Sequence, residues 1–290
     1  MGLQSLTITH RDRHWHEAFI RYVPRVFPRV SFRRWHELGG WNEDYVAFAM
    51  ADGEEVVANA SLHRMNIALR GEWVTGWQLG AVGVVPEWRG RGLQRQIMQR
   101  MLAGVGTKDL VFLFANDTVL DFYPLFGFKR RVETVFGSEH PVEPAVDRLS
   151  VLSLDRAEDR ALLARVAGSA APVSLEFGAR GYGGILLWYW TNFYQGCFYY
   201  SEAEDAVIVA EHDGDALRVC DVLARTPFDL RPYLSRIARV SARRVEFGFT
   251  PGTWWPEARA IANPQDSPLF VRGEHLLPAV AFKFPMLAQT

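Results

Sequence analysis

The sequence has few cysteines, no long apolar run and no excess of charge of either sign. Cys197 and Cys220 are its only cysteines, and no charged segment followed by an apolar run opens the chain, which predicts a cytoplasmic protein with reduced thiols. No stretch reaches the roughly 20 apolar residues of a membrane-spanning helix, so we expect no membrane partner.

The net charge of −1 is spread evenly, with 17 basic and 16 acidic residues in the first 145 positions and 15 and 17 in the rest. Neither half has the basic excess that is typical of proteins that bind nucleic acid. The sequence also lacks the P-loop, the dinucleotide Gly-x-Gly-x-x-Gly, the Gly-x-Ser-x-Gly elbow, His-Glu-x-x-His and paired Cys-x-x-Cys. We therefore expect no nucleic-acid partner and no metal site.

What the sequence does have is enough length and apolar content for two domains. It counts 290 residues, of which 49% are hydrophobic and 22% charged, a globular composition. The best linker candidate is Pro-Val-Glu-Pro at 141–144, because its prolines disfavour helix on either side. The sequence therefore predicts domains at 1–144 and 145–290.

Residues 82–94 have the composition of an anion site. They read Val-Gly-Val-Val-Pro-Glu-Trp-Arg-Gly-Arg-Gly-Leu-Gln, an apolar strand and a glycine-rich basic loop, and a helical pattern follows. The first turn of a helix has backbone N–H groups without intrahelical partners and carries partial positive charge, so it can hold a phosphate. Gly90 and Gly92 let the backbone come close, and Arg89, Arg91 and Arg95 add charged donors.

This loop resembles the pyrophosphate-binding signature of the GNAT superfamily of acyl-CoA-dependent N-acetyltransferases, Arg/Gln-x-x-Gly-x-Gly/Ala. Gln94 stands where the signature has a small residue, but a side chain turned outward need not block a phosphate that binds the backbone. A second stretch is similar to the same family: Asn, then Tyr seven positions on, then x-x-x-Gly-Phe. Asn116, Tyr123, Gly127 and Phe128 fit that spacing without a gap.

The resemblance implies acetyl-CoA as cosubstrate and a role for each matched residue. Asn116 is expected to hydrogen-bond the pantetheine arm, Tyr123 to direct its hydroxyl at the leaving sulfur, and a backbone N–H near Val84 to polarise the thioester carbonyl. The catalytic residue predicted in this way is Tyr123. The predicted cofactor-binding residues are Val82, Gly83, Val84, Arg89, Gly90, Arg91, Gly92, Leu93, Gln94, Arg95 and Asn116.

The apolar pattern predicts an α+β chain built on a mixed sheet. Strands are expected at 6–9, 45–50, 56–69, 73–85, 110–115 and 129–136, with one helix at 14–22, closed by Pro24, and one after the glycine loop. This is the element order of the GNAT fold, in which the fourth and fifth strands splay apart and the gap holds the cofactor.

After Pro144 a similar order begins again, which we interpret as a second, degenerate GNAT-like unit in tandem, with an unrelated α+β domain as the alternative. Strands are expected at 148–154, 206–211, 216–223 and 244–249, and helices at 159–166, 185–193 and 230–240. The counterpart loop has no glycine and places Asp229 where a phosphate needs positive surroundings, so one acetyl-CoA per chain is expected. The alternating apolar end at 279–287 predicts a docked strand.

Together these features predict an N-acetyltransferase that acts on a primary amine, in a small molecule or a peptide, by direct attack in a ternary complex. The alternative is a CoA-binding sensor or pseudoenzyme without turnover. Transfer needs a neutral amine, and the base is left open between a water chain and four side chains, Glu72, His63, Glu37 and His36. The aromatic residues at 188–190 and 254–255 are interpreted as core or interface rather than as an acceptor pocket.

Overall fold

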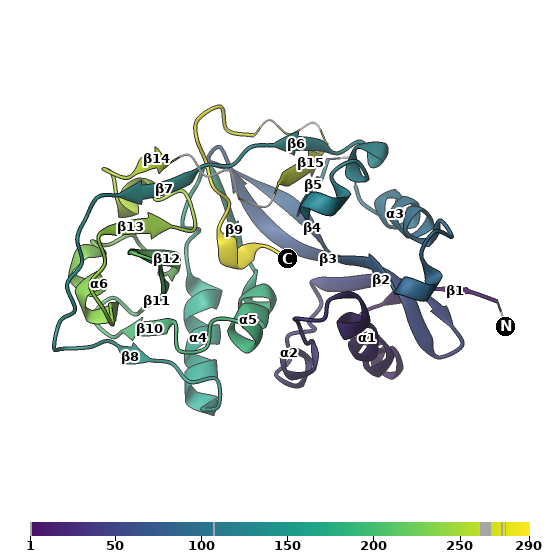
Figure 1. The fold of residues 1–290 in the computed structure, drawn as a ribbon, viewed down its shortest axis with the longest axis horizontal. Helices are drawn as coiled ribbons and strands as arrows, with labels where there is room; N and C mark the ends of the chain where they lie inside the picture. Colours follow the sequence, from purple (N-terminus) through teal and green to yellow (C-terminus); the bar gives the residue numbers. More distant parts are fainter. Residues whose placement is uncertain (1, 107, 262–267, 274, 276) are drawn as a thin grey trace.

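The computed structural model describes residues 2–106, 108–261, 268–273, 275 and 277–290. In these residues the strands form two mixed sheets with helices packed around them (Figure 1). The first sheet has the order β1-β2-β3-β4-β5-β15-β6, with β9 pairing β3, and the second has the order β14-β7-β13-β12-β11-β10-β8. The predicted α+β class and mixed sheet are confirmed.

The elements before Pro144 are β1 (Gln4–Ile8), α1 (Arg13–Val26), α2 (Arg33–Glu37), β2 (Tyr45–Asp52), β3 (Glu55–Leu69), β4 (Glu72–Val84), η1 (Pro86–Trp88), α3 (Leu93–Ala103), β5 (Leu110–Phe114), η2 (Asp117–Val119), η3 (Tyr123–Phe126), β6 (Lys129–Arg131) and β7 (Val135–Ser138). Those after it are β8 (Ser150–Val151), α4 (Ala157–Ser169), β9 (Phe177–Arg180), α5 (Gly183–Asn192), β10 (Phe198–Ser201), β11 (Ala206–Asp213), β12 (Ala216–Leu223), α6 (Arg231–Ile237), β13 (Arg244–Phe247), η4 (Gly252–Trp254), β14 (Arg259–Ile261), β15 (Leu269–Arg272) and η5 (Met286–Ala288).

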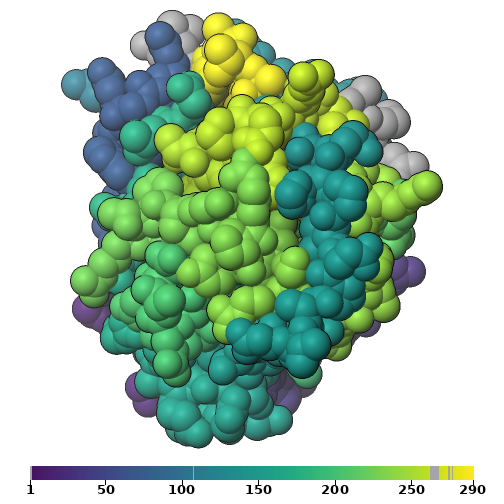
Figure 2. Space-filling view, turned by 90° about the vertical axis from the view of Figure 1, so that its left-hand side faces the viewer, coloured from purple at the N-terminus to yellow at the C-terminus, as the bar shows by residue number. Residues whose placement is uncertain are grey.

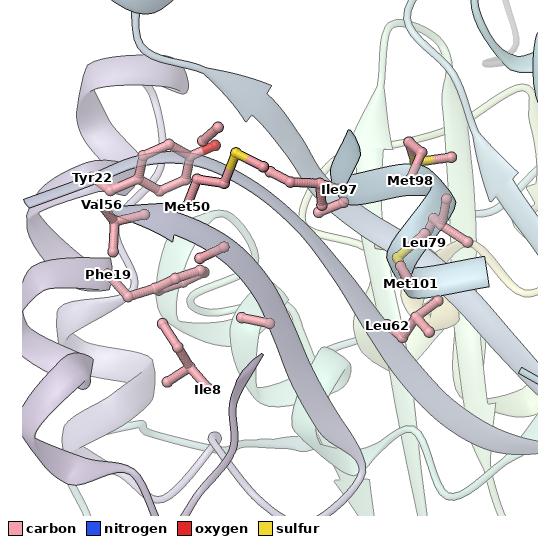
Figure 3. Close-up of a cluster of buried hydrophobic side chains, with 14 of the residues drawn as sticks. Ile8, Phe19, Tyr22, Met50, Val56, Leu62, Leu79, Ile97, Met98 and Met101 are labelled. Carbon is pink, nitrogen blue, oxygen red and sulfur yellow. The ribbon is translucent and has the colours of Figure 1, made fainter. Parts of the chain in front are cut away.

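The first sheet is covered on both faces. α1 packs on one face with Phe19 and Tyr22, and α3 packs on the other with Ile97, Met98 and Met101 (Figures 1 and 3). The buried residues of α3 recur at helical spacing, so one apolar stripe faces the sheet. α3 also connects β4 to β5, which run parallel, as such a crossover allows.

Several predicted boundaries are wrong. The strand expected at 148–154 covers only Ser150–Val151, and the helix expected at 230–240 ends at Ile237. Two further differences have a clear physical cause. α1 does not end at Pro24 but continues to Val26, since a proline in the last turn removes only one helical donor and Phe27 N–H still bonds the Val23 carbonyl at 2.8 Å. The strand expected at 129–136 is two strands, because the chain leaves the first sheet after β6 and enters the second at β7.

The two sheets exchange strands across Pro144. β7, from before this proline, lies between β13 and β14, whereas β15, from after it, lies between β5 and β6, and β9 pairs β3. Figure 2 shows the chain from β7 onward, in teal, crossing the green face of the second sheet. The division into 1–144 and 145–290 stays a prediction, and a cut at Pro144 crosses both sheets.

The second sheet repeats the order of the first. We call β1 to β5 with their helices the first unit, and β8 and β10 to β13 with theirs the second unit. In both, an antiparallel meander is followed by a helix and a parallel strand, β4-α3-β5 in the first and β12-α6-β13 in the second. Both units have a β-bulge near the end of the strand before that helix, at Gly80–Gly83 and at Cys220. This order supports the predicted tandem arrangement.

The end of the chain is docked, as predicted, but it is not a strand. We call 284–290 the C-terminal segment. Its backbone bonds reach both units: Met286 N–H donates to the Gly248 carbonyl at 2.8 Å, and the Gln78 amide donates to the Ala288 carbonyl at 2.7 Å. Leu287 is fully buried between the units. The predicted alternation therefore reflects contacts with two different partners rather than one sheet edge.

Candidate active site

The parallel strands β4 and β5 separate beyond Leu79 and Leu113, the last residues that pair. β4 continues to Val84, while Ala115 N–H after β5 bonds the Pro268 carbonyl instead. In the separated part, β4 has one residue more than β3 between Gly80 and Gly83, and Ala81 has a φ of 49°. A bulge leaves its extra residue without a ladder partner, and the Ala81 carbonyl accepts a bond from the Asn59 side-chain amide at 2.9 Å instead.

A cavity of about 290 Å³ occupies this gap on the side of α1 and α2. One part lies between β4, β5 and η3, and the other extends between α2 and α5. The described residues that line it are Phe27, Val30, Phe32, Trp35, Tyr45, His63, Leu79, Gly80, Ala81, Val82, Phe114, Asn116, Tyr123, Gly184, Ile185, Trp188 and Thr290.

Tyr123 and Asn116 reach this cavity from the chain that follows β5. The Tyr123 side chain is 5% exposed and packs against Phe128 and Phe270. Burial raises the pKa of Tyr123 to about 12, because the charged phenolate is poorly solvated there. The phenol is therefore protonated at neutral pH and can donate a hydrogen bond or a proton into the cavity.

The glycine-rich loop joins β4 to the N-terminus of α3 and is exposed. Gly90 and Gly92 have φ of 74° and 73°, which L side chains rarely adopt, and a Cβ at either position would meet no atom within 4 Å. Gly92 is the N-cap of α3, so the unpaired N–H groups of the first turn lie beside open space. Arg89 and Arg91 bond backbone carbonyls of their own turn, Val84 at 3.1 Å and Glu87 at 3.3 Å.

Comparison with known proteins agrees with this geometry. The family model of the acetyltransferase (GNAT) domain matches residues 11–131. Residues 11–131 form a GNAT domain. No curated protein matches the chain significantly.

Solved structures extend the fold likeness over nearly the whole chain. Eis1 from Mycobacterium abscessus aligns with a TM-score of 0.59 and 15% identity over 93% of this chain and 73% of its own. A GCN5-related N-acetyltransferase from Anabaena variabilis gives 0.55 and 14% over 93% and 72%, and one from Kribbella flavida gives 0.53 and 18% over 93% and 70%. At these identities the likeness shows the GNAT fold and no more.

Two expectations about the β4 end of the GNAT domain change. Gln94 does not turn outward: its side-chain nitrogen lies 3.1 Å from the Gly83 carbonyl and 3.3 Å from that of Asn59, when the amide is oriented to donate. Val84 does not line the cavity, and β4 borders it at Leu79–Val82 instead. The bulge of β4, and not Val84, is therefore the part of this strand that borders the cavity.

The sequence reasoning missed Arg272. It lies on β15 and lines, with Arg95 of α3, a second hollow of about 420 Å³ between α3 and η3. Arg272 Nε bonds the Phe126 carbonyl at 3.1 Å, which fixes the guanidinium beside η3. Nothing local marks this residue, because 177 positions of the chain separate it from Arg95 and only the fold brings the two together.

Of the four side chains proposed as base, His63 alone lines the cavity. Glu37 pairs with Arg34 at 3.7 Å, His36 Nε2 contacts His16 Nδ1 at 2.9 Å, and Glu72 is exposed at the far end of β4. His63 is 2% exposed, and burial lowers its pKa to about 4, partly offset by Asp44 and by a bond to the Gly181 carbonyl. Its ring is therefore neutral at pH 7.

The aromatic clusters divide between core and cavity. Trp190 and Trp255 are fully buried core residues, and Trp254 donates its indole N–H to the Val173 carbonyl at 2.9 Å, as the core interpretation predicts. Trp188 of α5 instead lines the cavity. Within the described residues, no helix is long and apolar enough to cross a membrane, and no three His, Cys, Asp or Glu side chains gather as metal ligands would.

Proposed function

We propose that this protein transfers the acetyl group of acetyl-CoA to a primary amine. The observation that carries the proposal is the cavity between β4 and β5, which brings Tyr123 and Asn116 to the bulged end of β4. GNAT domains use acetyl-CoA and act on amine acceptors, and the spacing from Asn116 to Tyr123, which resembles that of the family, supports the proposal.

The chain's residues fit each part of acetyl-CoA. The open space over Gly90 and Gly92, at the N-terminus of α3, accommodates the pyrophosphate. Asn116 lines the cavity, which supports a contact with the amides of the pantetheine arm. The hollow between Arg95 and Arg272 offers two cations to the nucleotide end, where a further phosphate is carried. Bound in this way, the cosubstrate supplies an activated thioester to the cavity.

The chemistry follows from what lines the cavity. Backbone N–H groups of the β4 bulge polarise the thioester carbonyl, and the amine nitrogen forms the new C–N bond as the C–S bond breaks. Tyr123 donates its proton to the departing sulfur, and the amine releases its own proton to His63 or to water. Neither cysteine is among the residues that line the cavity, which supports direct attack by the amine. Desolvation by the apolar wall lowers the pKa of a bound ammonium group and favours the neutral amine.

Thiol release separates this function from a CoA-binding sensor. The purified chain with acetyl-CoA and a panel of primary amines should release free CoA thiol steadily, with the acetylated amine found by mass spectrometry. Acetyl-CoA without amine gives the background rate. Tight binding of acetyl-CoA without release above that background, for every amine class, would favour the sensor.

A further inference from the structure

A further hollow of about 690 Å³ borders α5 and is separate from the cavity. It lies between α4, the first turn of α5, the chain at 38–42 and the paired strands β3 and β9, and we call it the α4–α5 groove. Figure 1 shows α4 and α5 side by side. Gly184 is the one described residue that lines both hollows, and a Cβ there would lie 3.1 Å from the Gly40 carbonyl oxygen. The contact between these two backbones therefore forms the wall between groove and cavity.

The charged side chains that line the α4–α5 groove are basic. They are Arg160 of α4 and Arg180 of β9, and no Asp, Glu or Lys is among the described residues of its lining. Arg160 bonds the Leu154 carbonyl at 2.7 Å, and Arg180 Nε bonds the Ala170 carbonyl at the end of α4 at 3.0 Å. Within the described part of the chain neither guanidinium forms an ion pair, whereas Arg165, also on α4, pairs with an aspartate at 2.6 Å. Each guanidinium thus keeps donors for an anion.

The N-terminus of α5 opens into the same groove. Gly181 and Gly183 are exposed, and a Cβ at either position would meet no atom within 4 Å. No side chain caps the helix at Tyr182, so the first N–H groups of α5 have neither an intrahelical nor a side-chain partner. These groups carry partial positive charge and favour an anion. Helix end and guanidinium groups therefore act on one space.

One buried donor of the groove lacks a partner. Trp190 lines the groove and is 0% exposed, and its Nε1 has no hydrogen-bond partner among the described residues. The ring packs on Phe198, with centroids 5.0 Å apart. An unpaired buried N–H is unfavourable, and an acceptor atom of a molecule in the groove would satisfy it. Beside this ring the lining is apolar, with Leu163, Leu186 and Leu187.

We propose that the α4–α5 groove binds a small molecule with an apolar body and one anionic group, a carboxylate or a phosphate ester. The anionic group lies at the N-terminus of α5 beside Arg160 and Arg180, and the body packs on Trp190 and the leucines. A volume of about 690 Å³ is in the usual range of small-molecule sites. The site does not depend on acetyl transfer. Its occupant would contact the turn whose Gly181 carbonyl is bonded to His63 of the cavity.

We choose 3-phenylpropionate and 3-phenylpropionamide as probes, because they have the same number of heavy atoms and differ in the charge of one end. In calorimetric titration the affinity for the acid should exceed that for the amide at least about tenfold, and saturating CoA should leave it unchanged. Equal binding of acid and amide, no binding of the acid, or its displacement by CoA would overturn the proposal. Phenyl phosphate distinguishes the two anions: tighter binding than that of the acid identifies a phosphate ester, and weaker binding a carboxylate.

A carboxylate built into the helix end should compete with the probe. Gly183→Asp places one in the first turn of α5, where it favours the helix, and Gly183 lies outside the left-handed region, so no backbone strain arises. The affinity for 3-phenylpropionate should fall at least about tenfold. Gly183→Asn has the same shape without the charge and should keep the affinity within about threefold. A folded Gly183→Asp that binds the acid as tightly as the unmodified chain would contradict the proposal.

Removing either cation should also weaken the binding. Arg160→Gln and Arg180→Gln should each lower the affinity for 3-phenylpropionate at least about tenfold and leave the amide unaffected. Arg243→Gln removes an exposed arginine outside the groove and is the matched control. An unchanged affinity in both folded groove variants would assign the probe to another place. If neither of them folds, the comparison of Gly183→Asp with Gly183→Asn decides.

Discussion

The junctions after β4 in the first unit and after β12 in the second have the same place in the fold and opposite contents. In the first, two left-handed glycines leave open space before α3. In the second, Asp229 Oδ1 accepts the Arg231 backbone N–H at 3.2 Å and its guanidinium at 2.8 Å, so the chain's own carboxylate occupies the N-terminus of α6. The junction before α3 therefore has room for a phosphate, whereas the Asp229 carboxylate would compete with one at the junction before α6.

The gaps beyond the parallel strands differ in the same way. The gap between β4 and β5 is a cavity, whereas Met286 of the C-terminal segment lies beside Gly248 after β13, where a Cβ would come within 2.4 Å of its sulfur. The turns that follow differ as well. η3 presents the Tyr123 phenol to the cavity, while η4 holds Trp254 with its N–H already bonded. The two units share one topology. Only the first unit leaves open the loop before its helix, the gap beyond its parallel strands and the turn that follows.

Removing the exchanged strands should have the largest effect, because both units depend on them for folding. A chain that ends at Pro144 loses β15, so the β5 edge is exposed and Phe270 no longer packs on Tyr123. We expect no cooperative thermal transition and no acetyl transfer, measured by circular dichroism and thiol release. Adding the 145–290 fragment during refolding should restore both. Cooperative melting with full turnover by the short chain would contradict this expectation.

Replacing the Tyr123 phenol should have the next largest effect, a loss of turnover. Tyr123→Phe removes the proton donor but keeps the ring, so kcat should fall by about 100-fold or more with acetyl-CoA affinity nearly unchanged. Trp254→Phe, at the corresponding turn of the second unit, should lower stability and leave kcat per folded molecule unchanged. A parallel loss of binding and turnover in Tyr123→Phe would indicate packing instead of acid catalysis.

Filling the space at the glycine-rich loop should weaken acetyl-CoA binding at the one site that we expect in the chain. Gly92→Val forces a β-branched residue to a φ of 73° and fills the space beside α3, so affinity for acetyl-CoA should fall by about tenfold or more. Gly71→Val imposes the same strain at a φ of 83°, in the turn between β3 and β4, and should spare the affinity. Calorimetric titration measures both and should give one site per chain. Two equivalent sites would contradict the closed second junction.

The last expected effect is on stability and not on activity, and it concerns Asp221, which lies next to the bulge of β12. It accepts bonds from the Tyr182 hydroxyl at 2.9 Å and from Val222 N–H at 2.8 Å, and burial raises its pKa to about 7. An unfolded Asp titrates near ~3.9. The folded state therefore keeps a proton that the unfolded state loses, so the contribution of Asp221 to stability should fall as the pH rises from about 4 to about 7, by up to ~1.4 kcal/mol per unit.

Denaturant titration across this pH range measures the effect. Asp221→Asn keeps the hydrogen-bonding shape without the charge, so it should remove this fall and leave the opposing rise that the low pKa of His63 gives between about pH 4 and 6.5. Asp205→Asn is the control, because Arg165 lowers the pKa of Asp205 to about 2, and its stability contribution is lost only below that window. The idea does not survive an unchanged slope in Asp221→Asn.

Local patterns predicted the part of the site that is local in the chain. The glycine loop, the strand before it, and the spacing from Asn116 to Tyr123 each depend on a few neighbouring residues, whose backbone preferences and apolar period can be read directly. The same holds for the closed second junction, where Asp229 and the absence of glycine stand in one short segment.

The remainder of the site depends on contacts that no local pattern encodes. Trp188 reads as an ordinary core tryptophan until α5 packs against α2, and Arg272 reaches the hollow beside α3 only because β15 crosses to the first sheet. The segment at 279–287 alternates like a strand, yet its backbone bonds Thr134, Gly248 and Thr250 on separate elements. Sheet pairing between distant segments decided these positions.

The strand exchange also determines when each sheet can be completed during translation. A ribosome releases β5 long before β15, so the sheet that carries the site waits with an open edge through about half of translation, while β7 waits likewise for β13. Neither sheet can close until most of the polypeptide has emerged, and long-range pairing of this kind is slow. The nascent chain is therefore the form of this protein most exposed to aggregation, and we expect its yield to depend on chaperones and growth temperature more than its final stability suggests.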